Sequence, residues 1–236
     1  MRGKNLLIIG WVSVLSSLFS LACAENQPGT VSLGEPLTLL DPFTLAGERN
    51  LLSDYAPTNS NGTINVVIEI PAGTNEKWEV NKSSGALKWE FRDGAPRRVQ
   101  YMGYPGNYGM IPRTVLPTED GGDGDPLDVI VLGSAVPRGS VVEARSIGVL
   151  KLLDNDEVDD KIIAVLIGSP FEEITKLKDL NLRFQGVTQM LEIWFENYKG
   201  PGKLESTGFG DEIEARKVIR SAIQAFQKHR SSSGGQ

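Results

Sequence analysis

The chain has 236 residues, which is enough for one full domain and too few for two of ordinary size. Its formal net charge of −6 argues against a nucleic-acid-binding protein, because such proteins carry a basic patch or stripe for the phosphate backbone. With a single His (His229) and a single Cys (Cys23) at opposite ends, a His/Cys zinc site is excluded, and Ser-His-Asp or Cys-His catalysis nearly so. Any metal ion must be held by oxygen ligands, which Mg²⁺, Mn²⁺ and Ca²⁺ prefer.

Residues 1–24 have the features of a cleavable signal peptide. Arg2 and Lys4 form a basic start, and an apolar run follows that ends in a small-x-small pattern at residues 22–24. Cleavage after this pattern removes the only cysteine, so the mature chain is indifferent to an oxidising compartment. We therefore expect a periplasmic or secreted protein. Two membrane-attached alternatives stay open, namely an uncleaved anchor, because the run is nearly long enough to span a bilayer, and a lipid on Cys23.

Residues 25–60 are rich in Pro, Gly, Asn and Thr, and we predict an irregular lead-in there. We expect the folded domain to extend over residues 61–230 and to begin with strands. Runs of alternating or β-branched residues between Gly, Pro and Asp turns predict six strands, at Asn65–Ile70, Lys77–Val80, Ala86–Phe91, Val129–Leu132, Ser140–Ile147 and Ile162–Ile167. Short strands of this kind favour a small barrel or sandwich.

Helices are predicted late in the chain. One candidate covers residues 172–180, and apolar residues at helical spacing predict amphipathic helices over residues 187–198 and 211–229. Residues 231–236 are predicted to be a disordered tail. The sequence has no internal repeat and no second domain, so we predict one α+β domain that is mainly β.

The segment from Gly121 to Leu132 carries three aspartates, Asp123, Asp125 and Asp128, within six residues on a Gly-rich turn. Two unit charges 4 Å apart repel by about 1 kcal/mol in water and by about 4 kcal/mol at an effective dielectric of 20. A folded site that gathers them therefore needs cations, and a solvated acidic loop is the alternative. An EF-hand fails on spacing, because its sixth position must be Gly and here it is Asp128.

A second acidic cluster lies directly before Lys161. It consists of Asp154, Asp156, Glu157, Asp159 and Asp160. Alone, such a cluster is typical of a polar hairpin loop. Together with the first cluster it predicts a site for several metal ions, because divalent ions draw carboxylates from separate segments.

The run Asp123-Gly124-Asp125-Pro126-Leu127-Asp128-Val129 resembles the Asp-x-Asp-Pro-x-Asp-Val pattern of the soluble family I inorganic pyrophosphatases. Other blocks resemble that family in the same order, from about residue 64 to 200. They are VIEIP at 67–71, KWEV at 77–80, YPGNYG at 104–109, the segment 148–161, and WFENYK at 194–199. The resemblance implies a five-stranded OB-like β-barrel flanked by helices, and a homo-oligomer, either a dimer or a hexamer.

The resemblance also implies a site in which each residue has a role. The metal ligands would be Asp123, Asp128, Asp154 and Asp159, with Glu69 contributing directly or through water. Asp125 and Tyr108 would be catalytic, with Asp125 as the general base. The phosphates would be held by Lys77, Arg97, Tyr108, Lys161, Tyr198 and Lys199, and Glu79 would line the cavity. Arg92 and Arg98 remain open as alternatives to Arg97 for the phosphate-binding arginine.

The implied activity is hydrolysis of inorganic pyrophosphate to two phosphates with Mg²⁺, or with Mn²⁺ as a substitute. The residue types fit it, because pyrophosphate is a compact anion that needs cations on both halves and a carboxylate to take a proton from water. On an alternating strand, Lys77 and Glu79 share one face, while Glu69 on an apolar strand needs a partner for its charge. The alternatives are a non-catalytic metal- or phosphate-binding module and a phosphatase for organic esters.

Cleavage of the signal peptide would create a mature N-terminus at Glu25. We expect mass spectrometry of the periplasmic or secreted fraction to find a chain that begins there. A full-length product retained in the membrane would instead support the uncleaved anchor.

Overall fold

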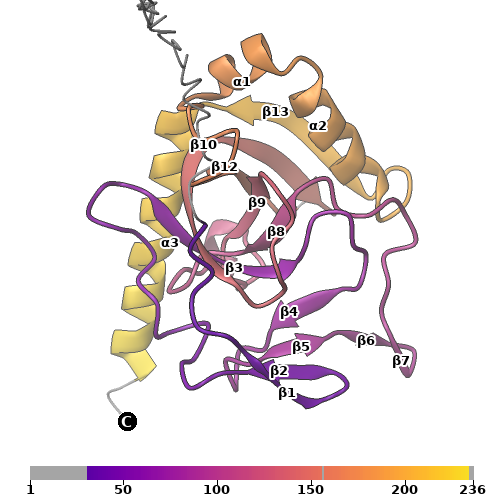
Figure 1. Cartoon of the computed structure of the whole chain (residues 1–236), viewed down its shortest axis with the longest axis vertical. Helices are drawn as coiled ribbons and strands as arrows, with labels where there is room; N and C mark the ends of the chain where they lie inside the picture. Colours follow the sequence, from indigo (N-terminus) through magenta and orange to yellow (C-terminus); the bar gives the residue numbers. More distant parts are fainter. Residues whose placement is uncertain (1–30, 156, 234–236) are drawn as a thin grey trace, which may run out of the picture.

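A computed structural model describes residues 31–155 and 157–233, and Figure 1 shows their arrangement. The expected signal peptide, residues 1–24, lies outside the described residues. Within the described part of the chain, no helix is both long enough and apolar enough to cross a membrane.

Five strands pair in a closed ring. β10 (Val141–Asp154) pairs with β12 (Lys161–Leu166), β12 with β9 (Asp128–Leu132), β9 with β8 (Asn107–Met110), and β8 with β3 (Ile64–Ile70). The ring closes because β3 pairs with the first residues of β10. Of these five pairings only β12–β9 is parallel. The predicted five-stranded OB-like barrel, within a mainly β, α+β fold, is confirmed.

β10 is longer than expected and organises the barrel. Its first residues pair with β3, and its last residues pair with β13 (Leu204–Gly210) and with the short β11 (Glu157–Val158). The predicted strand ended at Ile147, before a register shift near Gly148, and no strand was predicted at β13. β13 carries two glycines, which weaken a strand pattern, and its pairing with β10 stabilises it.

The barrel strands are buried on both faces. On β12, Ile162 and Ala164 belong to the cluster inside the ring, and α3 (Glu212–Ser233) covers one side of this cluster with Ala215 and Ile219. Burial on both faces explains why the barrel strands are nearly continuous apolar runs. The last helix was predicted over 211–229. It extends through Ser233, so the start of the segment 231–236 is helical rather than disordered.

The outer face of the barrel packs against two shorter helices. α1 (Leu177–Arg183) and α2 (Val187–Asn197) cover the cluster that includes Ile163 and Val165 (Figure 1). The helix expected over 172–180 begins later, because the residues before it form turns in which the Glu172 side chain accepts a hydrogen bond from its own segment.

A second sheet packs outside β3 and β8. Its strands, in order, are β1 (Thr38–Asp41), β2 (Thr44–Ala46), β5 (Leu87–Trp89) and β4 (Trp78–Val80). The lead-in 25–60 therefore contains a hairpin and is not irregular throughout. The local sequence does not predict this hairpin, because β2 pairs with β5, far along the chain.

The third short sheet lies beyond β5. The strand expected over 86–91 is divided into β5 and β6 (Phe91–Arg92), and β6 pairs with β7 (Ala95–Pro96) across the turn at Asp93-Gly94. A 3₁₀ turn, η1 (Thr118–Asp120), precedes the Gly-rich acidic loop.

Ring closure requires Gly109 on β8. A Cβ there would collide with the Val67 carbonyl of β3, although the backbone of Gly109 is not left-handed. We predict that Gly109→Ala lowers the free energy of unfolding by about 3 kcal/mol, the upper end of ordinary overpacking costs. Urea unfolding measures this. Gly62→Ala is the control, because its Cβ would meet nothing and only the left-handed φ of 84° opposes it. Equal losses in both variants would contradict the steric role of Gly109.

Candidate functional site

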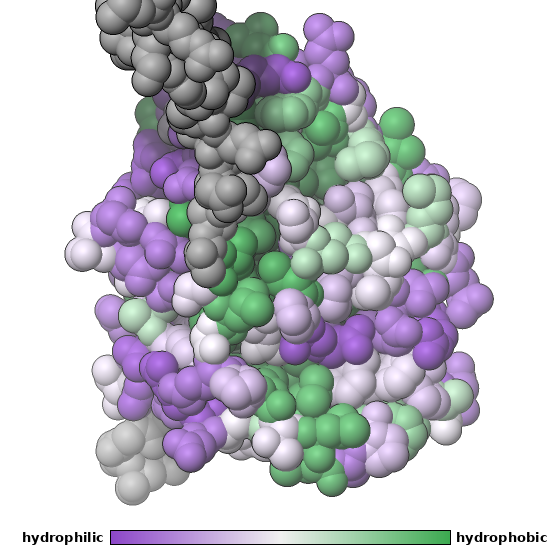
Figure 2. Space-filling view, viewed as in Figure 1, coloured by the Kyte–Doolittle hydropathy of each residue, from purple (hydrophilic) through white to green (hydrophobic). Residues whose placement is uncertain are grey.

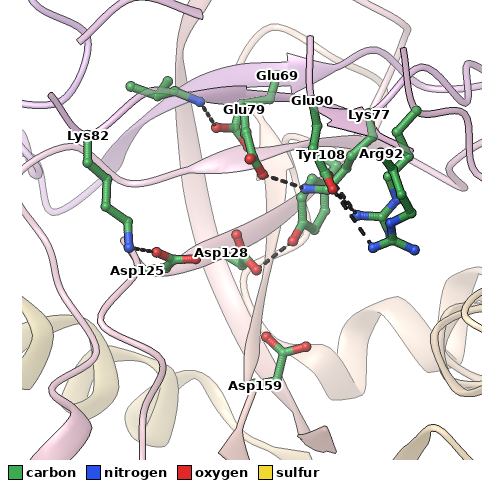
Figure 3. A network of polar contacts seen from close by, with 12 residues as sticks. Glu69, Lys77, Glu79, Lys82, Glu90, Arg92, Tyr108, Asp125, Asp128 and Asp159 are labelled. Carbon is green, nitrogen blue, oxygen red and sulfur yellow. Dashed lines mark hydrogen bonds and ion pairs between the residues drawn. The ribbon is translucent and has the colours of Figure 1, made fainter. Parts of the chain in front are cut away.

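Most of the predicted site residues line two cavities at one side of the barrel. Figure 3 shows the polar contacts around the first of them. The first cavity has a volume of about 510 Å³ and is mainly acidic. Its predicted members are Glu69, Lys77, Glu79, Tyr108, Asp125 and Asp128. The second has a volume of about 560 Å³ and is mainly basic. Its predicted members are Arg97, Asp154, Tyr198 and Lys199, together with the alternatives Arg92 and Arg98.

Lys161 lies at the centre of the site. This residue opens β12 and is only 1% exposed. Its Nζ donates to Asp128 Oδ2 at 2.7 Å and also to Asp159 Oδ1. The hydroxyl of Tyr108 donates to the same Asp128 oxygen at 2.5 Å. A buried ammonium is tolerated only with such partners, so these contacts hold β8, β9, β12 and the residue after β11 together.

The two carboxylates around Lys161 have opposite pKa shifts. Burial opposes the charge of Asp128, but Lys161 and Lys77 outweigh it and lower the pKa of Asp128. For Asp159 burial is the larger effect, and together with the charge of Asp128 it raises the pKa of that carboxyl. The site therefore gathers more negative charge than its lysines fully offset.

Glu69 has the partner that its strand position requires. The residue is 4% exposed, and its Oε1 accepts a hydrogen bond from Val80 N at 2.7 Å. Burial raises the pKa of Glu69 to about 8, although Lys77 acts in the opposite direction. As expected from the alternation of the strand, Lys77 and Glu79 lie on one side of β4 and form an ion pair at 3.5 Å.

The acidic loop holds Asp123 and Asp125 beside Asp128. Asp123 Oδ1 accepts a hydrogen bond from Asp125 N at 2.8 Å, and Asp125 O accepts one from Leu116 N at 2.8 Å. Burial, followed by the charge of Asp128, raises the pKa of Asp123. The side chain of Asp125 is half exposed and forms an ion pair with Lys82.

The basic cavity is connected to the acidic one through Asp159. Lys199 pairs with Asp154 at 2.5 Å and lies 3.9 Å from Asp159, which also accepts from Lys161. Tyr198 stacks on Trp194, with ring centroids 4.7 Å apart, and this contact fixes the end of α2. The same short chain of contacts therefore spans both cavities.

The three candidate arginines all line the basic cavity. Arg97 is the most buried of them, and its guanidinium contacts both oxygens of Glu90, at 2.8 and 2.6 Å. Arg98 pairs with Glu76 at 2.5 Å, while Arg92 is mostly exposed and lies 3.8 Å from Glu90. The assignment of Arg97 stays a prediction, because position alone does not separate the three.

The donor set of the site suits a hard cation. Its ligating atoms are carboxylate oxygens, and such atoms are the ligands that Mg²⁺ prefers. Across residues 31–155 and 157–233, no three Asp, Glu, His or Cys side chains lie close enough together to hold one ion. Four of the carboxylates, those of Asp125, Asp128, Asp154 and Asp159, instead form ion pairs with Lys82, Lys161 and Lys199.

Two residues of the site were not singled out in the sequence. Lys82 lines the acidic cavity and contacts Asp125, and Glu90 holds Arg97. No local pattern marks either residue, because the partner of Lys82 lies on a different segment and Glu90 lies between β5 and β6.

A family model described as "Inorganic pyrophosphatase" matches residues 66–227, which is more than half of the chain. This chain belongs to the inorganic pyrophosphatase family. An inorganic pyrophosphatase of Sulfolobus acidocaldarius is 38% identical over 184 residues, covering 75% of this chain and 96% of that one. One of Gluconobacter oxydans is 41% identical over 170 residues, covering 69% and 90%.

Solved pyrophosphatase structures share the fold. The inorganic pyrophosphatase of Schistosoma japonicum superimposes with a TM-score of 0.73 at 26% identity, covering 78% of this chain and 75% of that one. The pyrophosphatase of Helicobacter pylori gives a TM-score of 0.63 at 33% identity, covering 74% and 99%. The match therefore includes nearly the whole length of the bacterial relative.

In this pyrophosphatase fold, we predict that Lys161→Met lowers the free energy of unfolding by about 3 kcal/mol, because it leaves Asp128 and Asp159 facing each other without a cation. Urea unfolding without divalent ions measures the change. Lys199→Met is the matched control. It should cost less than about 1 kcal/mol, since Lys199 and Asp154 are each about a quarter exposed. An equal loss of unfolding free energy in both variants would show that Lys161 contributes no more to stability than Lys199 does.

Proposed function

We propose that this chain hydrolyses inorganic pyrophosphate to two phosphates, with Mg²⁺ as the working ion and Mn²⁺ as a substitute. The observation that supports this most is the contact chain from Tyr108 through Asp128, Lys161 and Asp159 to Lys199. It joins an acidic cavity to a basic one, and a substrate with two phosphates needs both.

The acidic side is where metal ions would be held. The proposed ligands there are Asp123, Asp128 and Asp159, with Glu69 contributing directly or through water. The fourth, Asp154, lines the basic cavity, where it shares Lys199 with Asp159. When bound, the ions supply positive charge to the phosphate oxygens and lower the pKa of coordinated water. Burial, together with the charge of Asp128, raises the pKa values of Glu69, Asp123 and Asp159, and such carboxyls gain much from a bound cation.

The side chains of the acidic cavity have separate roles in the proposed reaction. Asp125 accepts the proton of the attacking water, for which its half-exposed carboxylate in the acidic cavity is suited. Burial, and then the charge of Asp128, raises the pKa of Tyr108 well above its usual range. The Tyr108 hydroxyl therefore stays protonated and remains a hydrogen-bond donor at neutral pH. Lys77 lines the acidic cavity, and its backbone N donates to the carbonyl of Arg97, a residue of the basic cavity, at 3.0 Å.

The basic side would bind the phosphate that departs. Arg97, Tyr198 and Lys199 line it, and Glu90 holds Arg97 with its planar fork in a fixed orientation. Guanidinium and ammonium groups stabilise the negative charge that develops on the leaving oxygen.

Export and homo-oligomerisation are further proposals. The N-terminal pattern supports export.

Figure 2 shows an apolar patch over the β1–β2 hairpin, where Leu39, Leu40 and Phe43 are 60%, 64% and 37% exposed. This patch supports a contact between subunits. Light scattering after size-exclusion chromatography would find a monomer if this contact is wrong.

The direct test of the activity uses the chain from residue 25 onward. With pyrophosphate and millimolar Mg²⁺ we expect phosphate release. We expect a chelator to abolish it, because it removes the ions that would supply charge to the phosphate oxygens and lower the pKa of the attacking water. Mg²⁺ should also raise the melting temperature, since it binds the folded form. A protein that binds Mg²⁺ but releases no phosphate would support a binding module, and faster turnover of an aryl phosphate ester would support a broader phosphatase.

Replacement of Asp125 and of Asp128 should affect kcat and Mg²⁺ affinity differently. We predict that Asp125→Asn lowers kcat by roughly 10²–10⁴, the usual contribution of a general base, while Mg²⁺ affinity changes little. Asp128→Asn should weaken Mg²⁺ affinity as well as kcat. Glu119→Gln is the control, because Glu119 is exposed and lines neither cavity of the site. Steady-state kinetics across a Mg²⁺ titration measure all three. Similar mild losses in both aspartate variants would contradict these roles.

A further inference from the structure

Lys82 connects two segments of the acidic cavity. Its Nζ forms an ion pair with Asp125 Oδ1 and donates to the carbonyl of Gly124 at 3.2 Å (Figure 3). Lys82 lies in the turn after β4, and its partners lie in the acidic loop before β9. Within the described residues, no other hydrogen bond or ion pair joins that turn to residues 121–126.

The turn that carries Lys82 is itself well anchored. Asn81 N donates to Ala86 O at 2.8 Å and Gly85 N donates to Asn81 O at 2.8 Å. The Asn81 side chain accepts from Ser84 N at 3.1 Å. Gly85 O accepts from Leu51 N at 3.0 Å, which joins the turn to another part of the chain. Lys82 therefore extends from a rigid base.

The acidic loop is anchored on its other side only through its backbone. Gly124 N donates to Leu116 O and Leu116 N to Asp125 O, both at 2.8 Å. These bonds fix the path of the chain but leave the half-exposed Asp125 side chain free to rotate. The ion pair with Lys82 removes that freedom.

We propose that Lys82 is a positioning residue for the reaction, which holds the Asp125 carboxylate in the orientation that accepts a proton. The ammonium contacts Oδ1, so Oδ2 is left to act as the base. Lys82 touches neither the substrate nor the metal ions in this role. The inference rests on the proposed function, because it assigns Lys82 to the same site.

The exposure of the Lys82–Asp125 ion pair distinguishes a role in catalysis from a role in stability. The side chains of Lys82 and Asp125 are 56% and 50% exposed, and exposed ion pairs contribute little to stability. A reacting group displaced by about 1 Å, in contrast, can lower a rate by up to about 10²-fold. Loss of Lys82 should therefore reduce catalysis far more than stability.

The test is a double-mutant cycle on pyrophosphate hydrolysis with Mg²⁺. Lys82→Met should lower kcat about tenfold, with KM changed less than about threefold and the melting temperature within about 2 °C of the original. In the Asp125→Asn background the same change should alter kcat by less than about twofold, because the group that Lys82 positions is already lost. Lys82→Arg should restore at least about a third of kcat, since it keeps the charge.

The matched control is Lys151→Met. Lys151 forms a comparably exposed ion pair with Glu214 at 2.6 Å, outside both cavities, and its loss should leave kcat unchanged. A kcat within twofold of the original for Lys82→Met overturns the role of Lys82. A tenfold fall in kcat for Lys82→Met in the Asp125→Asn background also overturns it. A rise in KM without a fall in kcat does the same, because it indicates that Lys82 binds substrate. An original chain that releases no phosphate overturns the proposed function together with this inference.

Discussion

Lys161 is a buried ammonium that two carboxylates share, and the rest of the site depends on it. The residue is 1% exposed, at the first position of β12, where the barrel strands are otherwise apolar. Its partners come from different segments, since Asp128 opens β9 and Asp159 directly follows β11. A charge in such a position is stable only if both partners are in place, so the ion pairs require the barrel to be closed in the correct register.

This requirement links fold and chemistry. β9 and β12 are the one parallel pair in the ring, and their register sets Ile162 opposite Val129, next to Lys161 and Asp128. The same pairing therefore aligns the carboxylates and positions Lys161 between them. Tyr108 on β8 completes the arrangement with its hydrogen bond to Asp128. Three neighbouring strands thus bring one residue each to the same end of the barrel.

The basic residues of the second cavity come from other segments than the carboxylates of the barrel. Arg97 follows β7 and Lys199 follows α2, whereas Asp128 and Asp154 lie on barrel strands. Partly exposed ion pairs join some of these groups, such as Lys77–Glu79 on the β4 segment and Lys199–Asp154. Ion pairs with this partial exposure are weak, so cations or anions that enter the cavities can replace them at little cost.

The sequence by itself determined the family, the fold class and most of the charged residues that line the cavities. The Asp123–Val129 pattern and the blocks around it carry this information, because the chemistry needs given residue types in given local spacings. It also predicted most of the barrel strands and the last two helices, since alternation and helical spacing are local signals. The apolar pattern of its own strand was enough to show that the charge of Glu69 needs a partner.

Only the tertiary structure decided which residues meet across the chain. The pairing of β2 with β5 and that of β13 with β10 escaped the sequence because the partner strands are distant in the chain. The contact of Lys161 with Asp128 and that of Lys82 with Asp125 have the same origin, because their partners lie 33 and 43 positions away in the chain. Each is a contact between side chains, and closure of the barrel and docking of its loops set their distances.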